Sequence, residues 1–294
     1  QKVLGHFLTP EQRPLWFEHN VYWALYTSDK YVWCYSERMN WWEDGNVPQG
    51  CEEAILSARR KLANGQNLDI DLVPIIETAQ KREQDAITGD LAIRTAEIKA
   101  IENGVSRPKI DGNLEDEVWL KTEPLDPFVP MKAAQETVSA QTQTKVTYDN
   151  EYLYIAFRCE EPKAAELQVV GENRDDYVFT GDVVEVFIKP SEQSASFYHF
   201  AINPANVVWE GLHIDVLQTE FSPVWEHAAQ RGADFWSVEI ALPWKAINME
   251  TPKTGSQVKV NLCRERYTER EWTLWSQTVY HFLEPEHFGT FIFK

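Results

Sequence analysis

The sequence has few basic residues, few cysteines and no long apolar run, and each shortage excludes a class of protein. It contains 28 Lys and Arg against 46 Asp and Glu, a net charge of −18, and so negative a surface repels the phosphates of nucleic acids. No apolar run approaches the roughly 18 residues that span a bilayer, so we expect no membrane span. Four cysteines without a CxxC pair are too few for a disulfide scaffold and indicate no zinc site.

What is present is typical of a folded protein with an unusual number of aromatic rings. The 294 residues are 43% hydrophobic and 25% charged, which fits two domains or one large one. Aromatic residues make up 13%; they fill cores, and they also offer flat faces to sugar rings. The chain starts at Gln1 and shows no signal peptide, so we expect a processed product or a fragment of a longer protein.

The N-terminal third has the pattern of a helix, a strand and a second helix. Residues 14–27 have apolar side chains at helical spacing, YVWCYS at 31–36 is typical of a buried strand, and 52–64 predicts a helix that ends at Gly65. One buried strand cannot form a sheet, so we interpret residues 1–70 as the C-terminal fragment of an α/β barrel-like domain with exposed aromatic side chains. Charged, helix-forming residues at 74–102 predict a helical linker over 71–104.

From residue 105 to 294 the sequence predicts short strands separated by turns. Seven segments alternate or are β-branched, namely 144–149, 152–159, 182–189, 197–203, 235–242, 257–266 and 288–293. Strands without intervening helices indicate an antiparallel sandwich. The predicted fold class is therefore mainly β, a sandwich preceded by the α/β fragment and the helical linker.

Alternation along these strands predicts which side chains share a face. Glu185, Asn203 and Asn261 all lie opposite the apolar positions of their strands, so they fit the floor of a sugar site, although a solvated outer face has the same pattern. Cys159 and Cys263 fall on opposite faces, which predicts two buried free thiols.

Six segments in order resemble a known family. They are KIDGNLEDEVW (109–119), TKVTYDNEYLYIAFRCEEP (144–162), DVVEVFIKP (182–190), WSVEIALPW (236–244), VNLCRER (260–266) and HFLEPEHFG (281–289). Together they are similar to the family 9 carbohydrate-binding modules of xylanases and related secreted enzymes. The resemblance implies a non-catalytic β-sandwich that binds plant-type polysaccharide such as xylan or cellulose. It also implies an attached polysaccharide-degrading enzyme upstream, an extracellular or periplasmic location, no required cofactor and a possible structural calcium ion.

The resemblance also implies site residues. The two aromatic rings that sandwich a sugar in the family correspond to Phe179 and Phe282, and its carboxylate and amide to Glu185 and Asn203. An Arg frequent in the family is replaced by Ala201, for which His199 or Arg264 could substitute. Acidic residues beside strands could bind calcium; the candidates are Asp111, Asp149, Glu160 and Asp182.

Two other functions fit parts of the sequence. Glu37 follows the predicted strand 31–36, at the position where barrel enzymes carry catalytic groups, so the chain could be part of a glycoside hydrolase that cleaves O-glycosyl bonds. Some sandwich proteins bind haem through axial histidines, for which His199 and His213 are available. A cleft with two carboxylates would favour the hydrolase, and a Soret band would favour haem.

Overall fold

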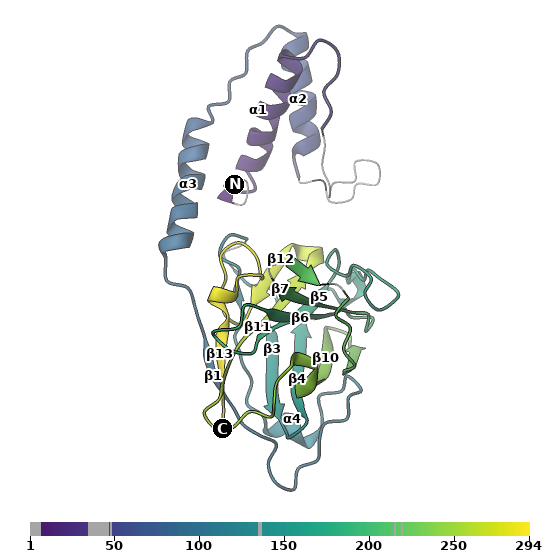
Figure 1. The fold of residues 1–294 in the computed structure, drawn as a ribbon. Coiled ribbons are helices and arrows are strands. Elements are labelled where there is room, and N and C mark those ends of the chain that lie inside the picture. The colour runs from purple at the N-terminus through teal and green to yellow at the C-terminus, as the bar shows by residue number, and fades with distance from the viewer. Residues whose placement is uncertain (1–6, 35–46, 48, 135–136, 215, 219) are drawn as a thin grey trace. The chain divides into compact units, whose positions relative to one another are not determined.

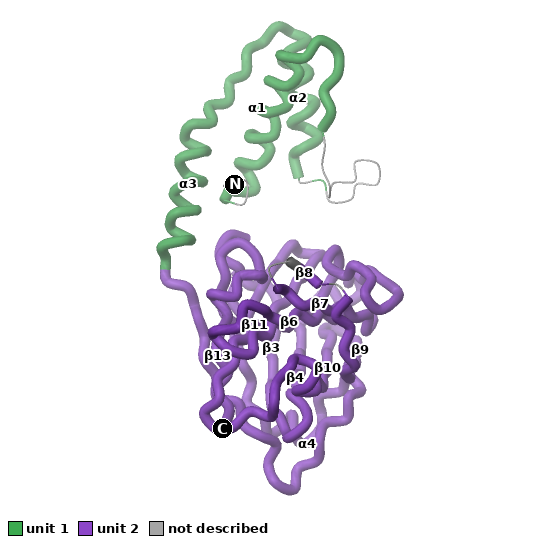
Figure 2. The backbone as a smooth tube through the Cα atoms, in the orientation of Figure 1, with its two compact units in different colours: residues 1–89 green, residues 90–294 purple. Residues whose placement is uncertain are grey.

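A computed structural model of the chain describes residues 7–34, 47, 49–134, 137–214, 216–218 and 220–294. The chain forms two compact units, residues 1–89 and residues 90–294 (Figure 2). Within the described ranges, no helix combines the length and the apolar character needed to cross a membrane.

The first unit contains a pair of packed helices, α1 (Gln12–Tyr26) and α2 (Cys51–Ala63). Thr9 and Gln12 exchange hydrogen bonds between side chain and backbone at the start of α1, a capping box. After α2, Gly65 adopts a left-handed φ of +62°, which ends the helix as the sequence predicts. The two helices meet through one small apolar cluster, made of Phe17, Val21, Tyr22, Leu25, Ile55, Ala58, Leu62 and Leu68 with Cys34.

The strand predicted at 31–36 is not formed over its described part. Residues 31–34 have no regular secondary structure, and residues 35–36, together with Glu37, lie outside the described residues. Tyr31 and Trp33 are 90% and 85% exposed, so these two rings do not enter a core. They are exposed aromatic side chains of the kind expected, whereas residues 31–34 do not form the buried strand that suggested a barrel fragment.

The helical linker is shorter than predicted. α3 (Val73–Thr88) ends before Gly89, and residues 95–98, which the sequence predicted as helix, form β1 (Thr95–Ile98). β1 pairs in parallel with the last strand of the chain, Thr95 beside Thr290. The second unit accordingly begins at Asp90 rather than at residue 105.

The second unit is a sandwich of two largely antiparallel sheets (Figure 1). The larger sheet has the order β1, β13 (Gly289–Phe293), β11 (Gln257–Arg266), β5 (Val183–Lys189), β6 (Phe197–Ile202), β7 (Val208–Ile214) and β8 (Val216–Gln218), with β12 (Glu271–Leu274) beside β11 and β2 (Val129–Pro130) beside β12. The smaller sheet has the order β3 (Thr142–Tyr148), β4 (Tyr152–Glu160), β10 (Phe235–Pro243) and β9 (Glu226–Arg231).

Short helical turns connect the strands: α4 (Glu117–Lys121) and the 3₁₀ turns η2 (Ala164–Glu166), η3 (Trp244–Ile247), η4 (Tyr267–Glu269) and η5 (Pro285–His287). The predicted mainly β sandwich is confirmed, and each of the seven predicted strand segments corresponds to a strand.

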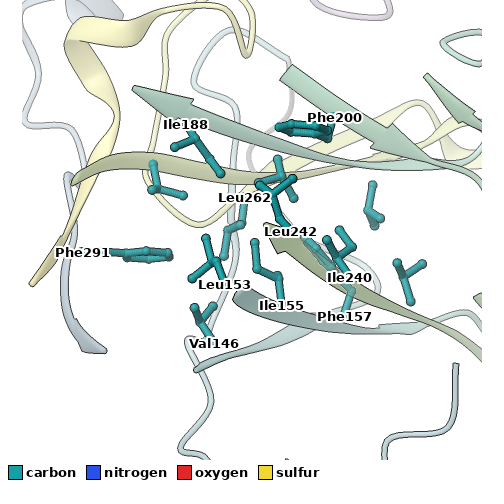
Figure 3. Packing of buried hydrophobic residues seen from close by; sticks show 14 of the residues in the cluster. Val146, Leu153, Ile155, Phe157, Ile188, Phe200, Ile240, Leu242, Leu262 and Phe291 are labelled. Carbon is teal, nitrogen blue, oxygen red and sulfur yellow. The ribbon is translucent and has the colours of Figure 1, made fainter. Parts of the chain in front are cut away.

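The core lies between the two sheets, where the apolar positions of every strand meet (Figure 3). Leu153, Ile155 and Phe157 of β4 face Ile188 of β5 and Leu262 of β11 across the interface. Cys159 belongs to this core, whereas Cys263 lies in a second cluster on the other side of the larger sheet. Both are buried and free, so the prediction from alternation is confirmed.

Two of the family-like motifs meet on the outer face of the smaller sheet. The Glu239 carboxylate accepts hydrogen bonds from the Asp111 and Gly112 backbone N–H groups, at 3.0 and 2.6 Å, and from Trp119 Nε1 at 2.6 Å. Glu239 is fully buried. It therefore holds the 110–119 segment, with α4, against the sheet, and these motif residues have a structural role.

Candidate functional site

The polar and aromatic side chains of the candidate site lie on the outer face of the larger sheet. Successive strand residues alternate between faces, and register places Phe187 beside His199 and Phe197 beside His213. We call this surface the aromatic face; it consists of Glu185 and Phe187 on β5, Phe197 and His199 on β6, Trp209 and His213 on β7, and Tyr177 and Phe179 from the loop before β5.

A buried acid–base pair lies at the centre of the aromatic face. Glu185 Oε2 and His199 Nε2 are 2.6 Å apart, and the two residues are 3% and 4% exposed. Burial raises the pKa of the Glu185 carboxyl and lowers the pKa of the His199 imidazole, because each charged form loses its hydration. Both shifts favour the uncharged forms of the two side chains.

Each partner of this pair keeps one polar atom without a hydrogen bond. Among the described residues, Glu185 Oε1 and His199 Nδ1 have no partner, and neither does the nearby His213 Nε2. Buried polar atoms are nearly always hydrogen-bonded. Three such atoms lie on one face, where a polar ligand could satisfy their hydrogen bonds.

Aromatic rings surround the pair. The Phe179 ring lies 5.4 Å from the His199 ring and 5.0 Å from the Trp209 ring, and the exposed Tyr177 packs edge-on against Phe179 at 5.3 Å. On the other side, Phe187 stacks on His199 at 4.2 Å. Phe179 is half-buried, so part of its ring is open to solvent beside His199.

Gly211 sets the position of the Trp209 ring. A Cβ atom at Gly211 would lie 2.6 Å from Trp209 Cη2 and 2.8 Å from Leu217 Cδ1. The missing side chain lets the indole lie along its own strand toward His199, whose ring is 4.9 Å away. Sequence reasoning missed Trp209 and Tyr177 and left His199 as a guess. The alternation of Trp209, Gly211 and His213 was a usable signal for this strand.

Phe282 is placed differently from the expectation of an exposed ring beside a cleft. It is 6% exposed and packs in a cluster with Met131, Phe187 and Phe288. The loop that carries it is held by Glu284, whose carboxylate accepts hydrogen bonds from the backbone N–H groups of residues 279, 280 and 281. Phe282 thus contributes to the packing of this cluster.

The side-chain amides of Asn203 and Asn261, both predicted to contact a ligand, form hydrogen bonds with backbone groups instead. Asn203 Oδ1 accepts from the Ala205 and Val207 N–H groups, and its Nδ2 donates to the Val170 carbonyl. Asn261 exchanges hydrogen bonds with the Ser276 backbone in the same way. Both residues are fully buried. They shape the turn after β6 and the approach of residue 276 to β11, and their geometry gives no support for ligand contacts.

Arg264 lies on the opposite face of the sheet from Glu185. Register pairs it with Val184, whose side chain belongs to the core, whereas Glu185 pairs with Cys263. Its guanidinium contacts Glu161 Oε2 at 3.0 Å and is fully buried. Arg264 is therefore not available to replace the missing Arg of the family. His199 lies beside Glu185 and is available for that role.

The four acidic residues proposed for calcium have separate environments. Asp149 accepts from the Glu151 and Tyr152 N–H groups and the Tyr154 hydroxyl. Asp111 pairs with Lys109, Asp182 accepts from the Gln168 N–H, and Glu160 lies exposed at the end of β4. In the part of the chain that the structure describes, no three His, Cys, Asp or Glu side chains are grouped as a metal site requires.

The haem hypothesis depends on His199 and His213. Their ring centroids are 5.8 Å apart on the same face, and His199 Nε2 is already bonded to Glu185. Burial and the neighbouring His199 lower the pKa of His213 to about 4. Nothing in this arrangement favours haem over a polar ligand.

Comparison with solved structures finds the same fold at low sequence identity. A protein from Bacteroides uniformis ATCC 8492, described as a candidate carbohydrate-binding protein, aligns with 69% of this chain and all of its own at 16% identity and a TM-score of 0.56. A family 9 carbohydrate-binding module from Caldicellulosiruptor kristjanssonii in complex with cellotriose aligns with 68% of this chain and 94% of its own, at 15% identity and a TM-score of 0.50. Its glucose complex aligns with 68% and 96%, at 17% identity and the same TM-score.

A search of curated proteins finds no match. The family model described as carbohydrate family 9 binding domain-like matches residues 110–294, which include every strand of the sandwich except β1 and all residues of the aromatic face. The chain therefore belongs to the carbohydrate family 9 binding domain-like family.

Proposed function

We propose that this chain binds carbohydrate, without catalysis, on the aromatic face. One observation carries the proposal: among the described residues, Glu185 Oε1 and His199 Nδ1 are buried and have no hydrogen-bond partner, and the Phe179 ring lies 5.4 Å from the His199 ring. A sugar hydroxyl both donates and accepts hydrogen bonds, so one sugar residue can serve both atoms. The apolar C–H face of the same ring can rest on Phe179 or Tyr177.

Two rings provide stacking surfaces at this site. Phe179 is half-buried beside His199, and the exposed Tyr177 packs edge-on against it. A hydrogen bond to a buried polar group and stacking on one ring contribute about 1–3 kcal/mol in total after desolvation. Because a millimolar Kd already corresponds to about 4 kcal/mol, we expect weak binding, at the millimolar end of the range.

We further propose that the ligand belongs to plant-type polysaccharide, cellulose or xylan. Fold neighbours in complex with cellotriose and glucose support this choice. In this proposal the chain directs an attached polysaccharide-degrading enzyme to its substrate, in an extracellular or periplasmic setting. The alternative, that the chain is itself part of a glycoside hydrolase, depends on Glu37, which lies outside the described residues.

Titration calorimetry with glucose, cellotriose and xylotriose tests the proposal. Phe179→Ala and Glu185→Gln should each weaken binding by about fivefold or more. Trp33→Ala is the matched control, because Trp33 is 85% exposed and belongs to the first unit. Unchanged affinity in both site variants would place the ligand elsewhere, and no binding by the wild type would contradict carbohydrate binding of these sugars.

A structural calcium ion stays a separate prediction. Asp182 is the candidate that best supports it, because its Oδ1 is buried and has no partner among the described residues. The melting temperature in millimolar calcium, compared with that in chelator, measures the effect, since a ligand that binds only the folded state raises it.

A further inference from the structure

A second polar depression lies on the other sheet of the sandwich. It has a volume of about 180 Å³ and is formed where the loop at residues 126–127 meets β3 and β4. We call it the β3–β4 pocket; its lining residues are Asp126, Pro127, Gln141, Thr142, Gln143, Arg158 and Glu160. None of these residues belongs to the aromatic face, whose strands are in the larger sheet.

Arg158 provides the donors of this pocket, and its orientation is fixed by Phe235. The guanidinium carbon lies 3.7 Å from the centre of the Phe235 ring. Such a contact contributes about 0.5–1 kcal/mol at an exposed site. No carboxylate among the described residues forms an ion pair with Arg158, so the N–H edges of its guanidinium stay open to a ligand.

The β9–β10 hairpin builds the platform under Arg158. The Gly232 N–H donates to the Phe235 carbonyl at 2.8 Å. A Cβ atom at Gly232 would lie only 2.2 Å from Phe235 Cε1, so the ring can lie over this turn only because the residue is glycine. The ring, and with it the guanidinium, is thus positioned by the fold and not by chance contact of exposed side chains.

Acceptor groups surround the guanidinium. Asp126 Oδ2 accepts a hydrogen bond from Gln143 Nε2 at 3.2 Å, which leaves Oδ1 of Asp126 and Oε1 of Gln143 for a ligand. Glu160 is exposed at the same rim. The pocket therefore combines a fixed planar donor with several carboxylate and amide acceptors.

We infer that the β3–β4 pocket binds a single neutral sugar residue, as a second site that rests on the proposed carbohydrate-binding function. Its two carboxylates and one guanidinium sum to −1, and the whole chain carries −18, which disfavours an anion. Vicinal hydroxyls, which donate and accept in adjacent positions, match a guanidinium beside carboxylates. Drug-sized ligands occupy roughly 300–1,000 Å³, so this pocket has room for one ring and not for a chain.

Calorimetric titration of the full chain with glucose, xylose, cellotriose and xylotriose tests this inference through the number of sites. The wild type should bind at two independent sites. Arg158→Met should weaken binding at the β3–β4 pocket at least tenfold. It should leave unchanged the affinity of the aromatic face, which Phe179→Ala weakens. Arg270→Met is the matched control, because Arg270 is exposed and lies over the Tyr267 ring at 4.3 Å, away from the pocket. Glucuronic acid should bind this site more weakly than glucose.

The outcomes separate this inference from the proposed function. One site per chain that Phe179→Ala removes and Arg158→Met leaves unchanged would overturn the second site and keep carbohydrate binding. Loss of a site in Arg158→Met, with a wild-type melting temperature and an unaffected Arg270→Met variant, would support it. Equal loss in Arg158→Met and Arg270→Met would show a general charge effect and overturn it. Absence of sugar binding by the wild type would overturn both proposals.

Discussion

Glu185 and His199 form a closed acid–base pair: their Oε2 and Nε2 atoms are 2.6 Å apart, and both side chains are shut off from solvent. The pair joins two neighbouring strands, β5 and β6, on the aromatic face. Because both side chains are buried, the protonation of the pair affects the stability of the fold as well as ligand binding.

The first prediction concerns pH. The pKa of Glu185 is raised above its ordinary 4.5 and that of His199 is lowered below its ordinary 6.5. Above pH 6.5 His199 is neutral in both states, while the folded protein still holds the Glu185 proton that the unfolded chain has lost. The free energy of unfolding should therefore fall as pH rises above 6.5, until the folded pKa of Glu185 is passed.

Glu185→Gln removes this titration. Denaturant unfolding of the variant and the wild type at pH 6.5, 7.5 and 8.5 measures the difference between the two free energies. The wild type should lose stability relative to Glu185→Gln across this range. Parallel curves would show that Glu185 does not hold a proton in the folded protein.

The second prediction concerns Phe282. Because its ring is buried in the cluster with Met131, Phe187 and Phe288, Phe282→Ala should lower the free energy of unfolding by about 3 kcal/mol, the low end for a buried Phe. Thermal and denaturant unfolding measure the loss. Tyr177→Ala, at a ring that is 59% exposed, is the control and should leave stability nearly unchanged. A stable Phe282→Ala variant with weak sugar binding would restore the expectation of an exposed ligand contact.

The third prediction concerns Glu239. Its carboxylate is the acceptor for three donors, including Trp119 Nε1. Glu239→Ala would leave these groups buried without a partner, and each such group costs about 1–3 kcal/mol. We expect a loss of at least 2 kcal/mol and faster proteolysis near residues 110–119. Glu239→Gln keeps one acceptor oxygen and should lose less; equal losses would contradict the role of the hydrogen bonds.

The sandwich could be predicted from the sequence because strand alternation is a local signal that burial enforces on each strand. Leu153, Ile155 and Phe157 follow it without exception, and all enter the core. The signal fails where pairing partners are distant. Residues 95–98 have a helix-forming composition, but β13, about 200 residues later, pairs them as a strand.

For the candidate site, the sequence predicted which face of the sheet carries it but not the contacts of the individual residues. Alternation grouped Glu185, Asn203 and Asn261 on one side of the sheet, and the register places Glu185 and Asn261 on the same face. It could not show that the amides of Asn203 and Asn261 are used by the backbone, since the partners at Val170 and Ser276 come from loops. Alternation does place Arg264 on the core face, with Val260 and Leu262, but it could not show that Glu161 is its partner, a contact across 103 residues.

The last prediction concerns that buried charge cluster. Glu161 contacts Arg264 at 3.0 Å and Arg266 at 2.7 Å, and all three side chains are at most 4% exposed. Burial by itself would raise the pKa of Glu161, but the hydrogen bonds and charges of Arg266 and Arg264 outweigh it, so the pKa is lowered from 4.5. The stabilisation from this carboxylate is therefore present above pH 4.5 and is lost as pH falls through the folded pKa.

Glu161→Gln should lower the free energy of unfolding much more than a surface substitution does, because it leaves two guanidinium groups buried without their shared counter-charge. Breaking one partner of a buried pair costs roughly 3–5 kcal/mol, and we expect a loss in that range at pH 7 by denaturant unfolding. Glu160→Gln, at the exposed neighbouring residue, is the control and should change stability by less than about 0.5 kcal/mol. The difference between wild type and Glu161→Gln should shrink as pH falls below 4.5. A difference that stays constant with pH would show that packing, and not the charge of Glu161, holds the two arginines.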